Sequence, residues 1–381
     1  MKSVTQIHET STGLRRGCSK RLRERPEFSR LDRVLKPKPA DTRAQILPTH
    51  TAPLFRAAVA RAAELLRAGE PVALPTETVY GLAANALDAR AVARIYEAKG
   101  RPAHNPVIVH IVGREMAQRC VADWPAAADS LADAFWPGPL TLVLPRARAI
   151  PDIVTAGGDT VGVRWPAHPF IQAVIRECGF PLAAPSANPS NRISPTNAEH
   201  VRACLGDRIR LIVDGGQSQV GIESTVIDVT ANPLRVLRPG MIHHTSLRAA
   251  LDKRGLKIAA AEAGSDSEGP LRSPGRLLKH YSPKATLRIL SWRDEEDLLA
   301  KMNAQKLPVE TAHVIAHTVI PGTGRFARVS LIPHDAEAFA RAIYAELHQC
   351  DEAGAGCIIV EALPETDEWQ AIADRLKRAA A

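Results

Sequence analysis

The chain of 381 residues lacks any run of about 18 consecutive apolar residues, so its sequence predicts no transmembrane helix. No apolar stretch follows Met1, and we expect no secretory signal. Cysteine is scarce: the six residues form no C-x-x-C pair, which argues against a zinc site and against a disulfide framework. We therefore expect free thiols, no zinc and a cytoplasmic location.

Two common nucleotide-binding patterns are also missing. The chain has no P-loop of the form G-x-x-x-x-G-K-[ST], so ATP, if it is a substrate, must be bound by another arrangement. Its C-terminal part has no G-x-G-x-x-G, so we expect no NAD site there.

The net charge of +8 is concentrated near the N-terminus. Residues 1–50 hold 12 lysines and arginines against five acidic residues, whereas the rest holds 37 against 36. Such a basic tail is usually disordered, although it could instead be a weak RNA-binding arm, a targeting segment or the product of an over-long start. The nearly neutral remainder argues against a protein whose whole surface binds nucleic acid.

Apolar residues at helical or strand spacing alternate from about residue 52 onward. Strands are predicted at 71–74, 106–112, 140–144, 160–164, 209–214, 225–229 and 234–237, with helices near 59–66, 88–99, 170–177 and 196–204. Thr196 and Glu199 suggest a capping box at the last helix. We predict a basic N-terminal extension at 1–50, a large α/β domain at 51–255, a linker at 256–285 and a small α/β domain at 286–381.

Polar segments border several of the predicted strands, where ligands gather in open α/β sheets. Lys99 and Arg101 flank Gly100 at a helix end and would suit a polyphosphate, because arginine offers two parallel donors and lysine a point charge. Ser186 and Asn188 offer short donors to phosphates. Taken singly, such segments also fit a turn, a polar loop or the basic last turn of a helix.

Taken together, the segments resemble, in order and spacing, the motifs of the threonylcarbamoyl-AMP synthase family, which has a YrdC-like fold. The matching stretches are PTETVYGL (75–82), KGRPAHNPVIVHI (99–111), FWPGPLTLVL (135–144), TVGVRWPAHP (160–169), PLAAPSAN (181–188), SPT (194–196), IVDGG (212–216), GIESTVIDV (221–229) and VLRPG (236–240). The stretch KHYSP (279–283) and the trailing domain are similar to the long, two-domain form of the family.

This resemblance implies a YrdC-like catalytic domain with a large twisted mixed sheet and an open catalytic cavity, a linker over the active site, and a smaller Rossmann-like α/β domain. It implies that L-threonine, bicarbonate or CO2, and ATP give threonylcarbamoyl-AMP and pyrophosphate, with Mg2+ accompanying ATP. The product would pass to a t6A transferase complex that modifies tRNA, so contact with tRNA would be indirect.

The family's functional residues fall on specific positions of this chain. The expected catalytic residues are Lys99, Arg101, Ser186 and Asn188. The expected ATP contacts are Lys99, Arg101, Asn105, Thr160, Ser186, Asn188, Ser194, Arg238, His280 and Tyr281. The expected threonine contacts are Thr78, His110, Arg164, Ala184 and Ser224. No protein side chain is assigned to a metal.

Two alternatives share the fold. A double-stranded RNA or ribosome-binding module would need a strongly basic concave face, which the nearly neutral body does not favour. A carbamoyltransferase component would carry extra cysteine pairs and an acylphosphatase module, both of which are missing from this sequence.

Overall fold

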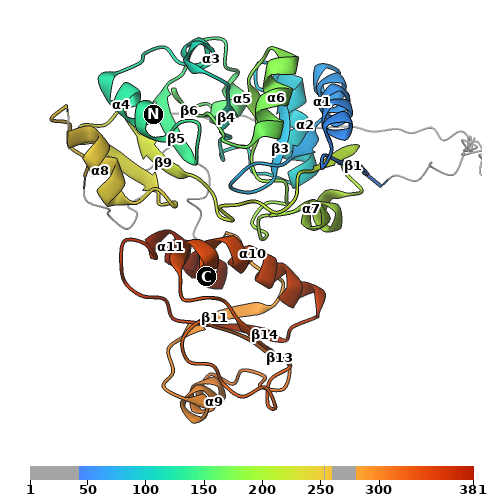
Figure 1. Ribbon diagram of the computed structural model, residues 1–381, viewed down its shortest axis with the longest axis vertical. Coiled ribbons are helices and arrows are strands. Elements are labelled where there is room, and N and C mark those ends of the chain that lie inside the picture. The colour runs from blue at the N-terminus through green and yellow to red at the C-terminus, as the bar shows by residue number, and fades with distance from the viewer. Residues whose placement is uncertain (1–42, 253, 260–279) are drawn as a thin grey trace, which may run out of the picture. The chain divides into compact units, whose positions relative to one another are not determined.

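The structure is a computed structural model that describes residues 43–252, 254–259 and 280–381. Two sheets organise these residues (Figure 1). A ten-stranded mixed sheet carries the first part of the chain, and a four-stranded parallel sheet carries the last part. The predicted fold class, a large mixed sheet with a second and smaller α/β domain, is confirmed.

The large sheet has the strand order β1-β8-β2-β3-β7-β4-β6-β5-β9-β10. Its strands are β1 (Gln45–Pro48), β2 (Val72–Leu74), β3 (Gly81–Asn85), β4 (Val109–His110), β5 (Leu140–Pro145), β6 (Thr160–Arg164), β7 (Leu182–Ala183), β8 (Leu211–Asp214), β9 (Thr225–Asp228) and β10 (Arg235–Arg238). Strand β7 runs antiparallel to both of its neighbours, β3 and β4, and β4 runs parallel to β6. These middle strands border the candidate site.

Helices pack against this sheet and bury its apolar side chains in one large core. They are α1 (Ala52–Arg67), α2 (Ala89–Lys99), α3 (Arg114–Cys120), α4 (Ala126–Phe135), α5 (Asp152–Thr155), α6 (Pro169–Cys178), α7 (Ala198–Leu205) and α8 (His244–Asp252). No helix of the described ranges is both long enough and apolar enough to cross a membrane.

Helix α2 shows how the local sequence positions the candidate site. Asp88 caps its first turn by accepting hydrogen bonds from two backbone N–H groups of that turn. Val92 and Ile95 are buried in the core. Gly100 ends the helix in the left-handed conformation, with φ of +58°, as the sequence predicts. The chain therefore turns away at this point, and Arg101 leaves the helix.

The small domain has the strand order β11-β14-β12-β13, with all strands parallel. Its elements are β11 (Thr286–Leu290), α9 (Glu295–Ala304), β12 (Ala312–Ala316), β13 (Arg328–Leu331), α10 (Ala336–Glu352), β14 (Cys357–Glu361) and α11 (Gln370–Ala380). Helices α10 and α11 lie on the side of this sheet that faces the first domain, and α9 lies on the other side (Figure 1).

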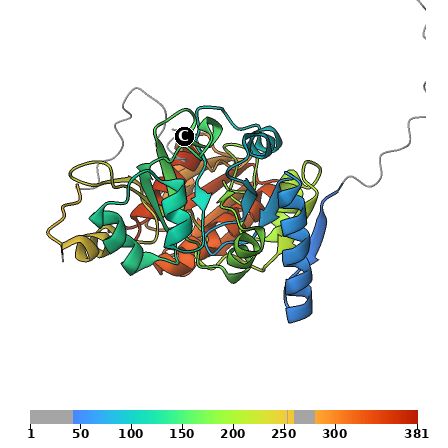
Figure 2. The same ribbon diagram turned by 90° about the horizontal axis from the view of Figure 1, so that it is seen from above.

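The predicted N-terminal extension at 1–50 is wrong at its end. Residues 45–48 form β1, which pairs in parallel with β8 at the edge of the large sheet, and Figure 2 shows it beside α1 at the margin of the domain. The basic composition of the preceding residues concealed this short apolar segment. Residues 1–42, and residues 260–279 of the predicted linker, lie outside the described part of the chain.

Two local predictions also need correction. The apolar stretch 106–112 forms a regular strand only at β4, because Val107 bonds to the carbonyl of Val154 in α5 rather than to a neighbouring strand. The capping box at α7 is replaced by Asn197, whose side chain accepts a hydrogen bond from the backbone N–H of His200. An asparagine cap accepts from the same backbone N–H groups of the first turn, which have no partner within the helix.

Candidate active site

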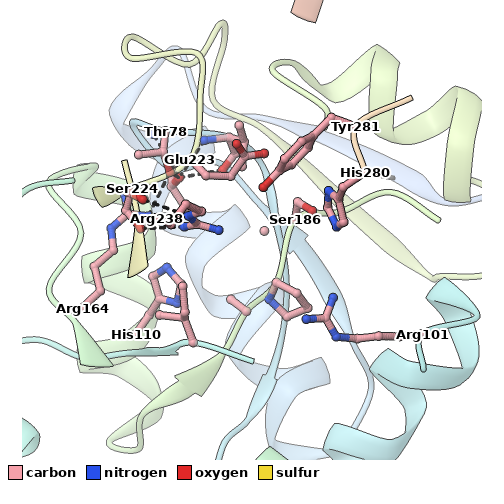
Figure 3. A pocket seen from close by; sticks show the side chains of 16 residues that line it. Thr78, Arg101, His110, Arg164, Ser186, Glu223, Ser224, Arg238, His280 and Tyr281 are labelled. Carbon is pink, nitrogen blue, oxygen red and sulfur yellow. Dashed lines mark hydrogen bonds between the residues drawn. The ribbon is translucent and has the colours of Figure 1, made fainter. Parts of the chain in front are cut away.

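The central cavity contains about 550 Å3 of space that no atom fills, part of which is open solvent. It is lined by residues at the ends of β4, β6 and β10, in the loops after β2 and β7, before β9, and at 280–281 (Figure 3). They are Thr76, Thr78, Val79, Gly81, Arg101, Ile108, His110, Arg164, Ala184, Pro185, Ser186, Glu223, Ser224, Arg238, His280 and Tyr281. Three are arginines and one is a glutamate, so the cavity suits an anionic ligand.

Arg164 is the last residue of β6 and is buried beside a carboxylate. Its Nη2 lies 2.7 Å from Oε1 of Glu77, and its Nη1 donates a hydrogen bond of 2.9 Å to Oγ1 of Thr78. Burial alone would raise the pKa of Glu77, but the positive charge of Arg164, together with hydrogen bonds from the backbone of Ala167 and from Arg164, outweighs burial and lowers this pKa. Glu77 is therefore ionised, and its ion pair holds the Arg164 guanidinium at a fixed place in the cavity wall.

His110 ends β4 and is buried next to this ion pair. Burial, reinforced by the charge of Arg164, lowers the pKa of His110 to about 3, although the carboxylate of Glu77 opposes the shift. Its Nδ1 is buried without a hydrogen-bond partner among the described residues. A neutral imidazole with an unused nitrogen is able to bind a polar ligand in the cavity.

We expect His110 to remain neutral at pH values well below neutrality. Because its pKa is lower in the folded state, the unfolded chain binds more protons below about pH 6.5, and His110 then lowers the free energy of unfolding as the pH falls toward 3. The free energy of unfolding of wild type should drop about 2 kcal/mol more between pH 7 and 5 than that of His110→Asn. Denaturant unfolding at both pH values measures this difference, and identical pH dependences would contradict it.

Arg238 lies between the two sides of the cavity (Figure 3). It ends β10 and donates from Nε and Nη2 to the carbonyl oxygen and the hydroxyl of Ser224, at 3.1 and 3.0 Å. Oγ of Ser224 is in turn 2.8 Å from Oγ1 of Thr141. Burial lowers the pKa of Arg238, yet a guanidinium keeps its charge at neutral pH.

Arg101 follows α2 and is oriented by the loop that comes after it. Its Nη2 donates to Oδ1 of Asn105 at 2.7 Å and to the carbonyl of Pro106 at 2.6 Å, and its Nε donates to the carbonyl of Asn105 at 2.9 Å. Burial lowers its pKa to about 10, so the side chain is positively charged at neutral pH. The guanidinium faces the cavity from the side opposite His110 and Arg164 (Figure 3).

Lys99 does not line the cavity, contrary to its expected role as a phosphate contact. Its ammonium is buried and donates to the carbonyl oxygens of Ser186 and Asn188. Burial and then the nearby charge of Arg101 place its pKa well below the usual range. The loop 186–188 passes close to the end of α2 and encloses the Lys99 ammonium. Lys99 therefore stabilises this loop from the side that faces away from the cavity.

His280 and Tyr281, the first described residues after the gap, line the cavity (Figure 3). Tyr281 is buried with φ of +63°, a backbone conformation that costs energy in a residue with a bulky side chain. The backbone N–H groups of His280 and Ser282 hold the segment by donating to the carbonyls of Arg378 and Asn191. Within the described residues, the Tyr281 hydroxyl and Nδ1 of His280 are buried without partners, which fits contacts to a ligand.

Sequence reasoning missed two carboxylates of the site, Glu77 and Glu223. Glu223 lines the cavity, and its Oε1 accepts a hydrogen bond of 2.6 Å from Oγ of Ser194. Both residues lie inside matched motifs, directly beside the residues to which a role was assigned. Each is a single glutamate among apolar and hydroxyl residues, and this pattern could have revealed them. A carboxylate buried in such surroundings needs a cation beside it.

Ten of the expected site residues line the cavity: Thr78, Arg101, His110, Arg164, Ala184, Ser186, Ser224, Arg238, His280 and Tyr281. The others lie around it. Asn105 and Ser194 hold Arg101 and Glu223, and Asn188 donates to the carbonyl of Arg192 within its own loop. Thr160 lines a smaller pocket that shares Ile108 with the main cavity.

Comparisons with known proteins cover both domains. A family model described as "Telomere recombination" matches residues 64–240, and one described as "Threonylcarbamoyl-AMP synthase, C-terminal domain" matches residues 242–381. The chain is 39% identical over 326 residues to the threonylcarbamoyl-AMP synthase of Pyrococcus abyssi, which spans 84% of this chain and 92% of that protein. It is 41% identical over 331 residues to the Bacillus subtilis enzyme of the same name, with the same coverage.

The fold is similar to a solved relative. The crystal structure of the Pyrococcus abyssi protein Sua5 complexed with L-threonine superposes with a TM-score of 0.79 and 37% identity, over 88% of this chain and 98% of that one. The likeness therefore includes both sheets. Because the curated relatives match over 92% of their own length, it concerns the whole two-domain enzyme, and this chain belongs to the threonylcarbamoyl-AMP synthase family.

Proposed function

We propose that this chain joins L-threonine, bicarbonate or CO2, and ATP into threonylcarbamoyl-AMP and releases pyrophosphate. One observation carries the proposal: a single cavity has cationic groups on two sides. Arg164 stands beside neutral His110 on one side, Arg101 on the other, and Arg238 between them (Figure 3). This arrangement suits an amino-acid carboxylate at one end and a polyphosphate at the other.

The Arg164 side would bind threonine. Its guanidinium is the partner for the amino acid's carboxylate, while the hydroxyls of Thr78 and Ser224 and the unpartnered Nδ1 of His110 offer polar contacts. The backbone of Ala184 completes this side of the wall. The solved complex of the Pyrococcus abyssi relative with L-threonine supports threonine as a ligand of this chain.

The opposite side would bind ATP. Arg101 and Arg238 would contact its phosphates, with the Ser186 hydroxyl and the segment 280–281 closing the cavity. Thr160, which lies in a neighbouring small pocket, would contact the nucleotide from beside the main cavity. Lys99, Asn105, Asn188 and Ser194 would act by holding these groups in place.

The chemistry needs positioning more than proton transfer. The amine of threonine forms a bond to the carbon of bicarbonate, water leaves, and N-carboxythreonine results. A carboxylate oxygen of this carbamate then attacks the α-phosphorus of ATP, and the bond to pyrophosphate breaks. The nucleophile is already ionised, so this second step requires no base from the enzyme. Negative charge gathers on the phosphorus centre, where Arg101 and Arg238 would stabilise it.

A divalent cation would accompany ATP. In the described ranges, no group of three or more histidine, cysteine, aspartate or glutamate side chains is placed to hold a metal ion. When bound with ATP, Mg2+ would offset part of the charge of the phosphates. The product would pass to a t6A transferase complex, and tRNA would be reached indirectly.

We also propose a cytoplasmic location. The five described cysteines are all free thiols, as is usual in a reducing compartment.

Pyrophosphate release tests the function directly. Purified protein with ATP, Mg2+ and bicarbonate should release pyrophosphate only when L-threonine is added, and a threonylcarbamoyl-adenylate should be detected by mass spectrometry. D-threonine serves as the control, because its carboxylate cannot meet Arg164 while its amine points at the phosphates. A folded sample whose release is absent, or is indifferent to threonine, would rule the proposal out.

A further inference from the structure

Glu223 lies where the two domains meet. Its Oε1 accepts from Ser194 of the first domain, whereas its Oε2 accepts from two residues of the small domain. Nε of Arg375 in α11 donates at 2.8 Å and the hydroxyl of Tyr344 in α10 at 3.1 Å. Burial alone would raise the pKa of Glu223, but the charges of Arg375 and then of Arg238 outweigh burial and lower it.

Arg375 contacts three separate segments of the cavity wall. Besides Glu223, it donates from Nη2 to the carbonyl of Pro239 at 2.9 Å, next to the cavity residue Arg238. Its guanidinium lies 5.4 Å from the ring centre of Tyr281, within the range of a cation–π contact. The side chain is 1% exposed, and Asp374 balances it through Nη1. Arg375 itself does not line the cavity.

The surrounding contact is tight and apolar. Val79, Ile193 and Ile222 of the first domain share one buried cluster with the side chains of α10 and α11. Gly221 has φ of +84°, and a Cβ atom there would lie 2.3 Å from the carbonyl oxygen of Ala340 in α10. The backbones of the two domains are therefore in direct contact at this point. A charged side chain buried in such a close contact, such as Glu223, has little room to reach another partner.

We propose that Arg375 of the small domain is a positioning residue for the nucleotide half of the active site, acting through Glu223, Pro239 and Tyr281. This inference rests on the proposed function and extends it to the small domain. Without Arg375, the Glu223 carboxylate is drawn toward Arg238, whose charge already acts on it. The cation assigned to the phosphates then shifts, and the Tyr281 ring loses its contact with the Arg375 guanidinium.

Steady-state kinetics and nucleotide binding test the inference together. Arg375→Met should lower kcat/KM for ATP about 100-fold, as expected when a reacting group is displaced, and should leave the KM for threonine nearly unchanged. Calorimetry with a non-hydrolysable ATP analogue should show that Arg375→Met also binds the analogue more weakly than wild type does. Adding Glu223→Gln to Arg375→Met removes the uncompensated carboxylate and should restore most of the lost affinity, because the two changes are coupled.

Lys377→Met is the matched control, since this exposed lysine lies on the same helix and should leave both parameters at the wild-type level. Arg375→Lys keeps the charge but not the forked contacts, and should fall between wild type and methionine. If Arg375→Met does not fold, Arg375→Lys tests the inference by the same comparison of the kinetic constants for ATP and for threonine.

Equal changes in the ATP and threonine constants, or no recovery in the double variant, would overturn the inference. A wild-type protein that binds the analogue but shows no threonine-dependent release would instead overturn the proposed reaction, and the binding data would still report on Arg375.

Discussion

Replacing Arg101 by alanine should reduce threonine-dependent pyrophosphate release about 100-fold to 1,000-fold, the range for removing one pre-oriented donor from a transition-state site. The effect should be large because Asn105 and Pro106 hold the guanidinium in one direction, so the cation does not need to be ordered when ATP binds. Arg101→Lys should recover only a small part of the rate, because an ammonium on a flexible chain cannot use the same acceptors.

A coupled pyrophosphate assay at saturating ATP and threonine measures this loss. Arg94→Ala is the matched control: this arginine lies on α2, the helix that precedes Arg101, is exposed, and pairs with Glu70 at 2.9 Å on the surface. Its loss should have little effect. Turnover of Arg101→Ala at the wild-type rate would remove Arg101 from the nucleotide site.

Arg164→Met should abolish threonine binding and also destabilise the protein by about 3–5 kcal/mol, the usual result of removing one partner from a buried ion pair. The destabilisation follows because Glu77, buried and ionised, would lose the cation that balances it. Threonine should then no longer raise the thermal unfolding midpoint, whereas it should do so for wild type.

A second variant separates the two effects. Arg164→Met combined with Glu77→Gln removes the unbalanced charge, so we expect stability to recover while threonine binding stays absent. Thermal unfolding with and without threonine distinguishes these outcomes. A threonine-dependent shift that survives in the double variant would show that Arg164 is not the carboxylate partner.

Much of the fold could be predicted from the sequence because its elements are locally consistent. The strands at 140–144, 160–164 and 225–229 are short β-branched runs bounded by turns, and helix α2 carries its own start and stop signals in Asp88 and Gly100. The two-residue strands β4 and β7 could not be delimited in this way. Their lengths depend on which distant segment supplies the hydrogen bonds, and this is decided only in three dimensions.

The sequence predicted residues that line the cavity better than residues that lie behind its wall. Arg101, Arg164 and Arg238 were found because each lies in a matched motif and lines the cavity. Lys99 was assigned to phosphate because a lysine beside an arginine suggests one, yet a loop 87 residues later in the chain encloses its ammonium. Arg375 had no sequence signal, since its partner Glu223 is 152 residues away.

Strand β1 has a consequence for how the protein can be shortened. It occupies the last position of the ten-stranded sheet and pairs with β8, and Thr49 adds a hydrogen bond of 2.8 Å to the carbonyl of Asp214. A chain begun at residue 51 would expose the peptide groups of β8, a buried and apolar strand. A bare edge of this kind recruits strands from other molecules, so that variant would tend to self-associate into aggregates even with every active-site residue in place.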